Sequence, residues 1–206
     1  MKTAAIFQQN YDNYCAQLAK TDFGKVKFIL DIDDNEVIFL GKKYIVSGDG
    51  IKDEYGKQAS YSVAIVIAQY ILLCPGELYL SKEWVSYKDF SSDAYAGTQI
   101  FMSKPENNAK ELFSGKIKAL GKACQAYGGK QHDVDVPYEI AYRFDILPRI
   151  SVVLLFNDVE EDFSAQCKML FQKHVEHYID PESLAIALGY LINKLHKLTT
   201  IHDEKE

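Results

Sequence analysis

The sequence predicts an α+β fold in which a mainly antiparallel sheet of about five strands packs with a buried central helix and further helices. Strand-like segments fall into two separate blocks, residues 25–47 and residues 138–156. The most apolar segment, residues 58–73, lies between them and has the character of a buried helix. Strands that cluster in blocks, rather than alternating with helices, favour antiparallel pairing.

Length and composition predict one domain over residues 1–198, followed by a polar tail at residues 199–206. The 206 residues are 48% hydrophobic and 25% charged, which is ordinary globular usage. A chain of this length can bury a core without disulfides or metals. The sequence contains no internal repeat, biased linker or low-complexity run that would mark a second domain.

The first part of the chain predicts a helix followed by a small sheet. Residues 3–20 carry apolar side chains at spacings of three and four, as in an amphipathic helix. In residues 25–47 the period changes, because Val26, Phe28 and Leu30 alternate with their neighbours as strand residues do. Short polar breaks divide this segment, so we expect a three-stranded antiparallel meander there.

Two further helices are predicted in the middle of the chain. Residues 58–73 contain alanines and are followed by Pro75-Gly76, which favours a buried central helix over a strand. This segment is shorter than the roughly 20 residues that span a membrane. Residues 106–127 repeat apolar side chains on one face and end at Gly128-Gly129, so we expect one continuous helix with a glycine cap.

The last third of the chain predicts two strands and then two helices. Residues 138–156 give two strands separated by Pro148-Arg149. Residues 164–178 and 182–198 have helical character. Asp180-Pro181 places a capping residue and a first-position proline where the second helix would start. The two strands complete the sheet of the expected fold.

The charge balance argues against nucleic acid and membranes as partners. The net charge is −6 and no run of Lys or Arg exceeds two residues, whereas both partners require a concentrated basic patch. Residues 1–14 lack the apolar core of a secretory signal, so we expect a cytoplasmic protein with free thiols. The cysteines stand far apart and form no CxxC motif: Cys15, Cys74, Cys124 and Cys167.

Two histidines indicate a candidate metal site. His174 and His177 are three residues apart, so on a helix both rings would lie on one face and reach the same ion. A third ligand would come from elsewhere, and Asp162, Asp133 or His132 has suitable chemistry. The alternative is a solvated helix face. The metal interpretation implies an enzyme that uses His174, His177 and Asp162.

An acidic cluster precedes the helix expected at residues 164–178, and its members are Asp158, Glu160, Glu161 and Asp162. Negative charge stabilises a helix N-terminus, which accounts for the cluster without a ligand. The alternatives are a cation site and a carboxylate partner for Arg149.

Arginine and aromatic residues mark a candidate ligand site. Of the 23 cationic residues only two are arginines, Arg143 and Arg149. The planar guanidinium offers a fork of donors that lysine cannot imitate, so each arginine indicates a structural carboxylate pair or an anion site. Trp84, Tyr87 and Phe90 lie close together in a segment expected to lead into a loop. Such side chains line a pocket or seal the edge of the core.

Three segments carry a resemblance to a known family. They are WVSYKDF at Trp84–Phe90, the Gly128-Gly129 loop with the acidic residues after it, and the segment Arg143–Leu188 with its Leu-Pro-Arg turn. Over residues 20–198 the chain resembles the family catalogued as domain of unknown function 3786. The resemblance implies a link to anaerobic bacteria and archaea, and it implies no particular reaction. It gives weight to six positions: Trp84, Asp89, Pro148, Arg149, Asp162 and Phe163.

We therefore expect a cytoplasmic binding module for a small anionic ligand or cofactor in anaerobic metabolism. Aromatic side chains would line its pocket and arginines would meet the anion. The expected site residues are Trp84, Tyr87, Asp89, Phe90, Arg143 and Arg149. The alternatives are a non-catalytic subunit that docks on a protein partner through an apolar patch, and the metal-dependent enzyme. The sequence identifies no particular cofactor and contains no standard catalytic motif, so enzyme activity stays open.

Overall fold

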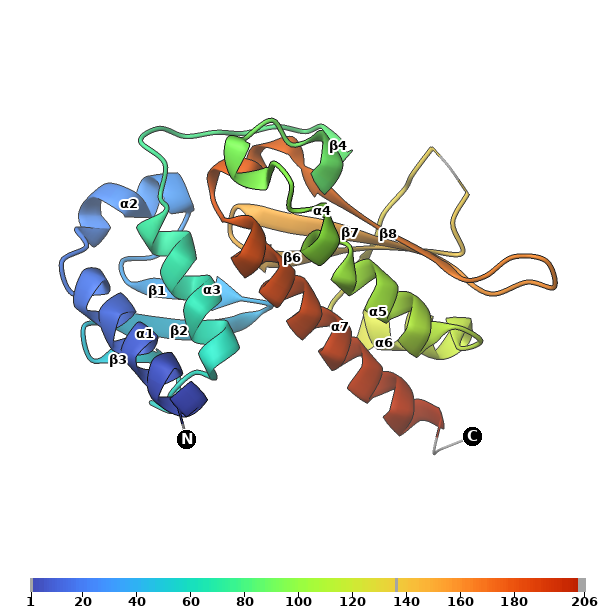
Figure 1. Cartoon of the computed structure of the whole chain (residues 1–206), viewed down its shortest axis with the longest axis horizontal. Helices are drawn as coiled ribbons and strands as arrows, with labels where there is room; N and C mark the ends of the chain where they lie inside the picture. Colours follow the sequence, from blue (N-terminus) through green and yellow to red (C-terminus); the bar gives the residue numbers. More distant parts are fainter. Residues whose placement is uncertain (1, 136, 204–206) are drawn as a thin grey trace.

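The structure is a computed structural model that describes residues 2–135 and 137–203, with the side chains of residues 8–135 and 137–200. It contains helices and two antiparallel sheets, one of three strands and one of five, which confirms the α+β class. The sequence led us to expect one sheet, whereas the two strand blocks form separate sheets (Figure 1). Within the described residues no helix combines the length and apolarity needed to cross a membrane.

The N-terminal part of the fold places three helices around the smaller sheet. Its elements are α1 (Lys2–Leu18), α2 (Phe23–Leu30), β1 (Glu36–Phe39), β2 (Lys42–Ser47), β3 (Gly50–Asp53) and α3 (Tyr61–Leu72). The three strands pair in chain order as an antiparallel meander. The Tyr11 hydroxyl accepts a hydrogen bond from the Ile51 N–H at 2.9 Å and so ties α1 to β3.

The prediction of a meander was wrong for its first strand. Residues 23–30 form α2, and the third strand is β3 instead. Leu30 is fully buried and Val26 and Ile29 pack against the core, whereas Phe28 is 73% exposed. Buried positions at spacings of three and four define a helix face, and the alternation in this short segment fitted both periods.

The prediction of a buried central helix over residues 58–73 is confirmed by α3. It packs against α1, β1 and the long C-terminal helix α7 (Pro181–Asp203). Gln69 donates a hydrogen bond to the Tyr14 hydroxyl at 3.1 Å, and the Tyr70 hydroxyl donates to the Leu30 carbonyl at 2.6 Å. Helix α3 therefore connects α1 and α2 to the rest of the fold.

The larger sheet is antiparallel throughout, in the spatial order β4-β8-β7-β6-β5. Its strands are β4 (Trp84–Ser86), β5 (Lys130–Gln131), β6 (Ile140–Leu147), β7 (Ile150–Asn157) and β8 (Gln166–Gln172). The two strands predicted over residues 138–156 are confirmed by β6 and β7, which the Pro148-Arg149 turn joins. Edge strands β4 and β5 are short, so much of the sheet edge carries no neighbouring strand.

The helix predicted over residues 164–178 was wrong. This segment contains β8 and then the 3₁₀-helix η3 (Lys173–His177). Met169 is buried while Lys168 is exposed, as expected when successive side chains point to opposite faces of a sheet. Pairing with β7 from Gln166 to Phe171 decides its structure, and this long-range contact is invisible in the local sequence.

Shorter helices accompany α7 on one side of the larger sheet (Figure 1), namely α4 (Gln99–Met102), α5 (Lys104–Phe113) and α6 (Ile117–Ala126). We expected one continuous helix over residues 106–127, and this was wrong. The break includes Gly115, whose φ of +74° favours glycine. The Asp158 carboxylate accepts the N–H groups of Gly115 and Ile117 at 2.6 and 3.2 Å. It thereby satisfies donors at the start of α6.

The start of α7 agrees with the sequence prediction. Pro181 is its first residue, and the Asp180 carboxylate accepts the Ser183 N–H at 2.9 Å. The helix continues to Asp203, beyond the tail boundary expected at residue 199. Thr199 is fully buried, so the polar tail does not begin there.

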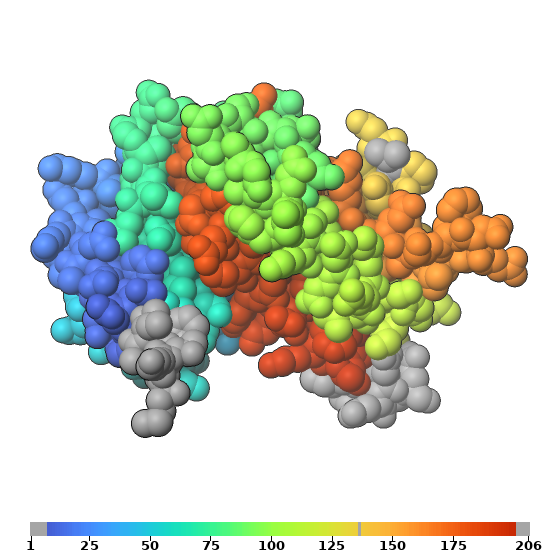
Figure 2. Space-filling model, in the orientation of Figure 1, coloured from blue at the N-terminus to red at the C-terminus, as the bar shows by residue number. Residues whose placement is uncertain are grey.

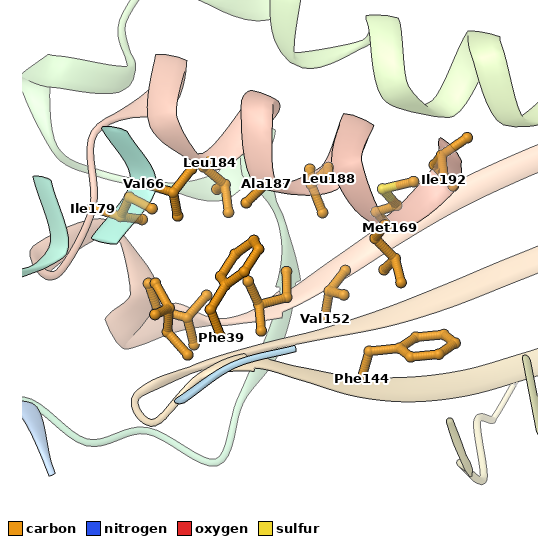
Figure 3. Close-up of a cluster of buried hydrophobic side chains, with 14 of the residues drawn as sticks. Phe39, Val66, Phe144, Val152, Met169, Ile179, Leu184, Ala187, Leu188 and Ile192 are labelled. Carbon is orange, nitrogen blue, oxygen red and sulfur yellow. The ribbon is translucent and has the colours of Figure 1, made fainter. Parts of the chain in front are cut away.

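A single hydrophobic cluster connects the two sheets. Figure 3 shows α7 lying over β6, β7 and β8, with Leu184, Leu188 and Ile192 facing the sheet. Phe39 of β1 and Val66 of α3 join the same cluster from the N-terminal part. Burial of such side chains stabilises a fold by about 1.5–3 kcal/mol each. The two sheets therefore depend on the same apolar contacts.

The turn after α6 gives a first testable prediction. The Gly129 N–H donates to the Cys124 carbonyl at 2.8 Å, and a Cβ at Gly129 would lie 2.8 Å from both that oxygen and the Phe144 ring. Gly129→Ala should therefore destabilise the protein by about 1–3 kcal/mol in urea unfolding. The control is Gly189→Ala on α7, where a Cβ meets nothing within 4 Å. It should stabilise the protein by up to about 1 kcal/mol, and equal effects would contradict the described turn.

Candidate functional site

A polar cavity of about 680 Å³ lies at the free edge of β8, between β8, α5 and the segment after β4. We call it the lysine cavity, because Lys88, Lys110 and Lys168 line it. The other lining residues are Ser86, Asp89, Glu106, Tyr138, Asp162, Phe163, Ser164, Ala165, Gln166 and Cys167.

The cavity exists because β4 covers only part of β8. Its three residues pair with Leu170, Phe171 and Gln172, and then the chain turns away. The Ser86 N–H donates to the Asp89 carboxylate at 3.1 Å, while the Ser86 hydroxyl accepts the Lys88 N–H at 3.4 Å. This capping box starts a 3₁₀-helix and ends β4. The edge of β8 before Leu170 consequently faces the cavity.

The Glu106 carboxylate lies at this exposed edge. Helix α5 supplies Glu106, whose Oε1 accepts the Met169 N–H at 2.9 Å. Burial raises the pKa of Glu106 above its ordinary value, against the opposite effects of the Met169 N–H and three lysines. Glu106 thus replaces a missing strand partner and places a desolvated carboxyl group in the cavity wall.

Three ammonium groups surround that carboxyl group from different elements. Lys110 is four residues after Glu106 on α5, and Lys168 and Lys88 belong to β8 and the turn after β4. In the part of the chain that the structure describes, none of the three forms an ion pair within 4 Å. The carboxyl groups of Asp89, Glu106 and Asp162 line the same cavity, so its three ammonium groups face an equal number of carboxyl groups. Because no ammonium group is held in a close ion pair, each can still turn toward an anion.

The cavity wall includes the thiol of Cys167, and burial raises the pKa of that thiol far above its ordinary value. A protonated thiol reacts poorly as a nucleophile or metal ligand. Across residues 2–135 and 137–203, no group of three or more His, Cys, Asp or Glu side chains is arranged to hold a metal ion.

Arg149, predicted to meet a ligand anion, instead holds the C-terminal end of α2. Its Nε donates to the Ile29 carbonyl at 3.0 Å and one terminal nitrogen donates to the Phe28 carbonyl at 3.1 Å. The other terminal nitrogen lies 3.6 Å from the Asp31 carboxylate. A cation at a helix C-terminus is favourable, because the last carbonyls carry partial negative charge.

The backbone of Arg149 also forms hydrogen bonds. Its N–H donates to the Tyr70 hydroxyl at 3.2 Å, and its carbonyl lies 3.1 Å from His174 Nε2. His174 Nδ1 accepts the Ser81 N–H at 2.8 Å, which leaves Nε2 as the protonated nitrogen. Burial lowers the pKa of His174, in keeping with this neutral form. Both ring nitrogens are therefore used in structural contacts.

The predicted metal site is not assembled among the described residues. His174 has no free ring nitrogen, and His177 stacks on Tyr79 with ring centroids 3.9 Å apart. Asp162 lies at the turn between β7 and β8, in the wall of the lysine cavity. The HxxH spacing predicted a shared helix face, and positions i and i+3 do share a face in the 3₁₀-helix η3. The site fails because His174 is buried with both ring nitrogens in hydrogen bonds.

The aromatic residues predicted to line one pocket lie in different places. Tyr87 is buried, and Phe90 packs against Tyr95 and Phe171 with centroids 4.8 and 5.9 Å away, so both belong to the core edge. Trp84 points to the other face of the sheet, because its neighbour Val85 is buried on the helix side. Of the six expected site residues, only Asp89 lines the lysine cavity.

On that other face, Trp84 meets Arg143. The guanidinium carbon of Arg143 lies 5.9 Å from the Trp84 ring centroid, and His132 packs edge-on against the same ring. Arg143 Nε donates to Asp145 at 3.0 Å and a terminal nitrogen donates to the Ser151 hydroxyl at 3.1 Å. Arg143 thus forms a structural ion pair with Asp145, which is one of the two roles that the sequence allowed for it.

Fold and cavity define the class of the protein as an α+β domain with a lysine-lined cavity at a sheet edge. The chain belongs to the family described as domain of unknown function (DUF3786), whose profile matches residues 25–194, and this confirms the resemblance. No curated protein and no solved structure matches the chain. Three positions to which the resemblance gave weight meet at the lysine cavity: Asp89, Asp162 and Phe163.

The position of Arg149 gives a second testable prediction. Arg149→Lys should lower the free energy of unfolding by about 2 kcal/mol, because lysine cannot reach both carbonyls of α2. Arg143→Lys is the matched control, since its side chain is 38% exposed and its pair with Asp145 should contribute under about 1 kcal/mol. Urea unfolding of both variants measures the difference. A larger loss for Arg143→Lys would contradict the assignment.

Proposed function

We propose that this protein binds a small ligand carrying carboxylate or phosphate groups, and that the lysine cavity is its binding site. The observation that carries the proposal is the set of three lysines without ion pairs around Glu106. The cavity volume of about 680 Å³ lies within the range of small-molecule sites, about 300–1,000 Å³.

The three ammonium groups of the wall can bind an anion, against the opposite charge of Asp89 and Asp162. Each ammonium group offers rotatable donors, and charge-assisted hydrogen bonds to carboxylate or phosphate are stronger than neutral ones. Ser86 and Ser164 add hydroxyl groups, while Phe163 and Tyr138 add apolar surface. An anionic ligand with a small organic body matches this combination.

Glu106 makes the proposed site sensitive to pH. When its carboxyl group is protonated, the cavity gains one net positive charge and a hydrogen-bond donor. Because burial raises the pKa of Glu106, protonation begins at a higher pH than for an exposed glutamate. Anion affinity therefore increases as the pH falls through the Glu106 pKa.

The proposal keeps the ligand class expected from the sequence and changes the residues that bind it. Lysines take the role expected of Arg143 and Arg149, since both guanidinium groups already have structural partners. We also propose a location in the cytoplasm and a role in anaerobic metabolism. Cysteines without disulfides suit a reducing compartment.

Calorimetric titration tests the site. Inorganic sulfate, inorganic phosphate and succinate are the probes, and at least one should bind with a Kd near or below about 1 mM. The double variant Lys110→Ala/Lys168→Ala should weaken binding at least about tenfold. The control is Lys118→Ala/Lys197→Ala, which removes the same charge from exposed positions outside the cavity wall. Equal losses for both double variants would refute the proposed site.

The pH dependence gives a separate prediction for Glu106→Gln. Glutamine keeps an oxygen for the Met169 N–H and cannot ionise. Sulfate is the probe here, because its charge is constant in mildly acidic and neutral solution. Wild-type affinity should rise on acidification, whereas the variant should bind more tightly at neutral pH and respond little to pH. A wild-type profile in the variant would show that Glu106 does not face the ligand.

A further inference from the structure

The turn between β7 and β8, residues 159–163, has the features of a docking element, and we call it the hairpin tip. Figure 1 shows that this hairpin extends away from the helices, and Figure 2 shows it as a projecting lobe, coloured orange. We propose that the hairpin tip binds a partner protein whose surface offers an apolar pocket rimmed by basic side chains. Asp162 and Phe163 also line the lysine cavity, so the hairpin tip adjoins the proposed ligand site.

Backbone hydrogen bonds give the hairpin tip a defined shape. The Glu160 N–H donates to the Phe163 carbonyl at 2.9 Å, and the Phe163 N–H donates to the Glu160 carbonyl at 3.2 Å. Only Glu161 and Asp162 lie between these residues, so the chain reverses in a tight turn. A preformed loop loses less conformational entropy when it binds, which favours its use in recognition.

The base of the hairpin is fixed to the body of the protein. The Asp158 carboxylate accepts hydrogen bonds from the Gly115 and Ile117 N–H groups of the α5–α6 turn. The Asp158 N–H in turn donates to the Glu139 carboxylate at 2.6 Å. Strand pairing continues to Asn157 and Gln166. These contacts hold the projecting turn in one orientation.

The hairpin tip exposes apolar side chains. Phe163 is 65% exposed and Val159 is 49% exposed. Exposed aromatic residues on a projecting turn incur a solvation cost in the free protein, and burial against a partner removes it. Aromatic anchors of this kind contribute much of the binding energy in protein interfaces.

The charges around these side chains indicate the partner's chemistry. Glu160, Glu161 and Asp162 are exposed, and the structure shows no ion pair for them among the residues it describes. Asp158, by contrast, is used at the start of α6. Three free carboxylates beside two apolar side chains complement a basic rim around an apolar pocket. They would be repelled by an anionic membrane.

Site-specific photo-crosslinking tests the inference. A benzophenone amino acid at Val159, in the full chain produced in its native host, should give an adduct that mass spectrometry identifies. The same amino acid at Tyr55, a control position that is 87% exposed on the smaller-sheet part, should not give that adduct. The absence of any adduct specific to Val159 would overturn the proposal.

The purified partner then gives the decisive affinity measurement. In buffer without sulfate or phosphate, so that the lysine cavity carries no anion, Phe163→Ala should weaken partner binding at least about tenfold. Glu160→Gln/Glu161→Gln should reduce the salt dependence of the association rate. Unchanged thermal unfolding would confirm that both variants fold, as expected for exposed positions. A partner that binds Phe163→Ala as tightly as the wild type would overturn the proposal, even if it crosslinks.

Discussion

The Arg149 contacts are the interaction on which the rest of this structure depends. The guanidinium group binds the end of α2, while the peptide groups of the same residue bind Tyr70 of α3 and His174 of η3. Burial raises the pKa of the Tyr70 hydroxyl, which therefore keeps the proton that it donates to the Leu30 carbonyl. One turn between two strands thus connects the smaller-sheet part of the fold to the larger sheet.

The position of the lysine cavity follows from this framework. His174 is fixed beside the β6–β7 turn, and the preceding strand β8 pairs with β7 from Gln166 to Phe171. Strand β4 covers only three residues of the other β8 edge before the Ser86 capping box turns the chain away. Glu106 then meets the free Met169 N–H. A buried structural network and an open, charged site are therefore neighbours along the same strand without sharing side chains.

The sequence predicted those elements whose signals are local. The α3 segment, the β6 and β7 strands and the Asp180 cap follow from composition, period and capping chemistry. Residues 23–30 and 164–178 were assigned wrongly because short apolar segments fit both periods and long-range pairing decides. Arg149 was noticeable because the sequence contains only two arginines, but the rarity of a residue type cannot distinguish a structural role from a ligand-binding role. Lys110 and Lys168 were hidden among 21 lysines, and only the fold brings them to Glu106.

The central claim is that the Arg149 network builds the fold while the lysine cavity binds the anion. Amide chemical shifts recorded by NMR during a sulfate titration test it directly. The largest shifts should occur at the Cys167, Met169 and Lys110 amides, which belong to the cavity wall or its exposed edge. The amides of Tyr70 and Arg149 should stay unchanged. Saturable shifts centred on Arg149, with none at the cavity amides, would contradict the account.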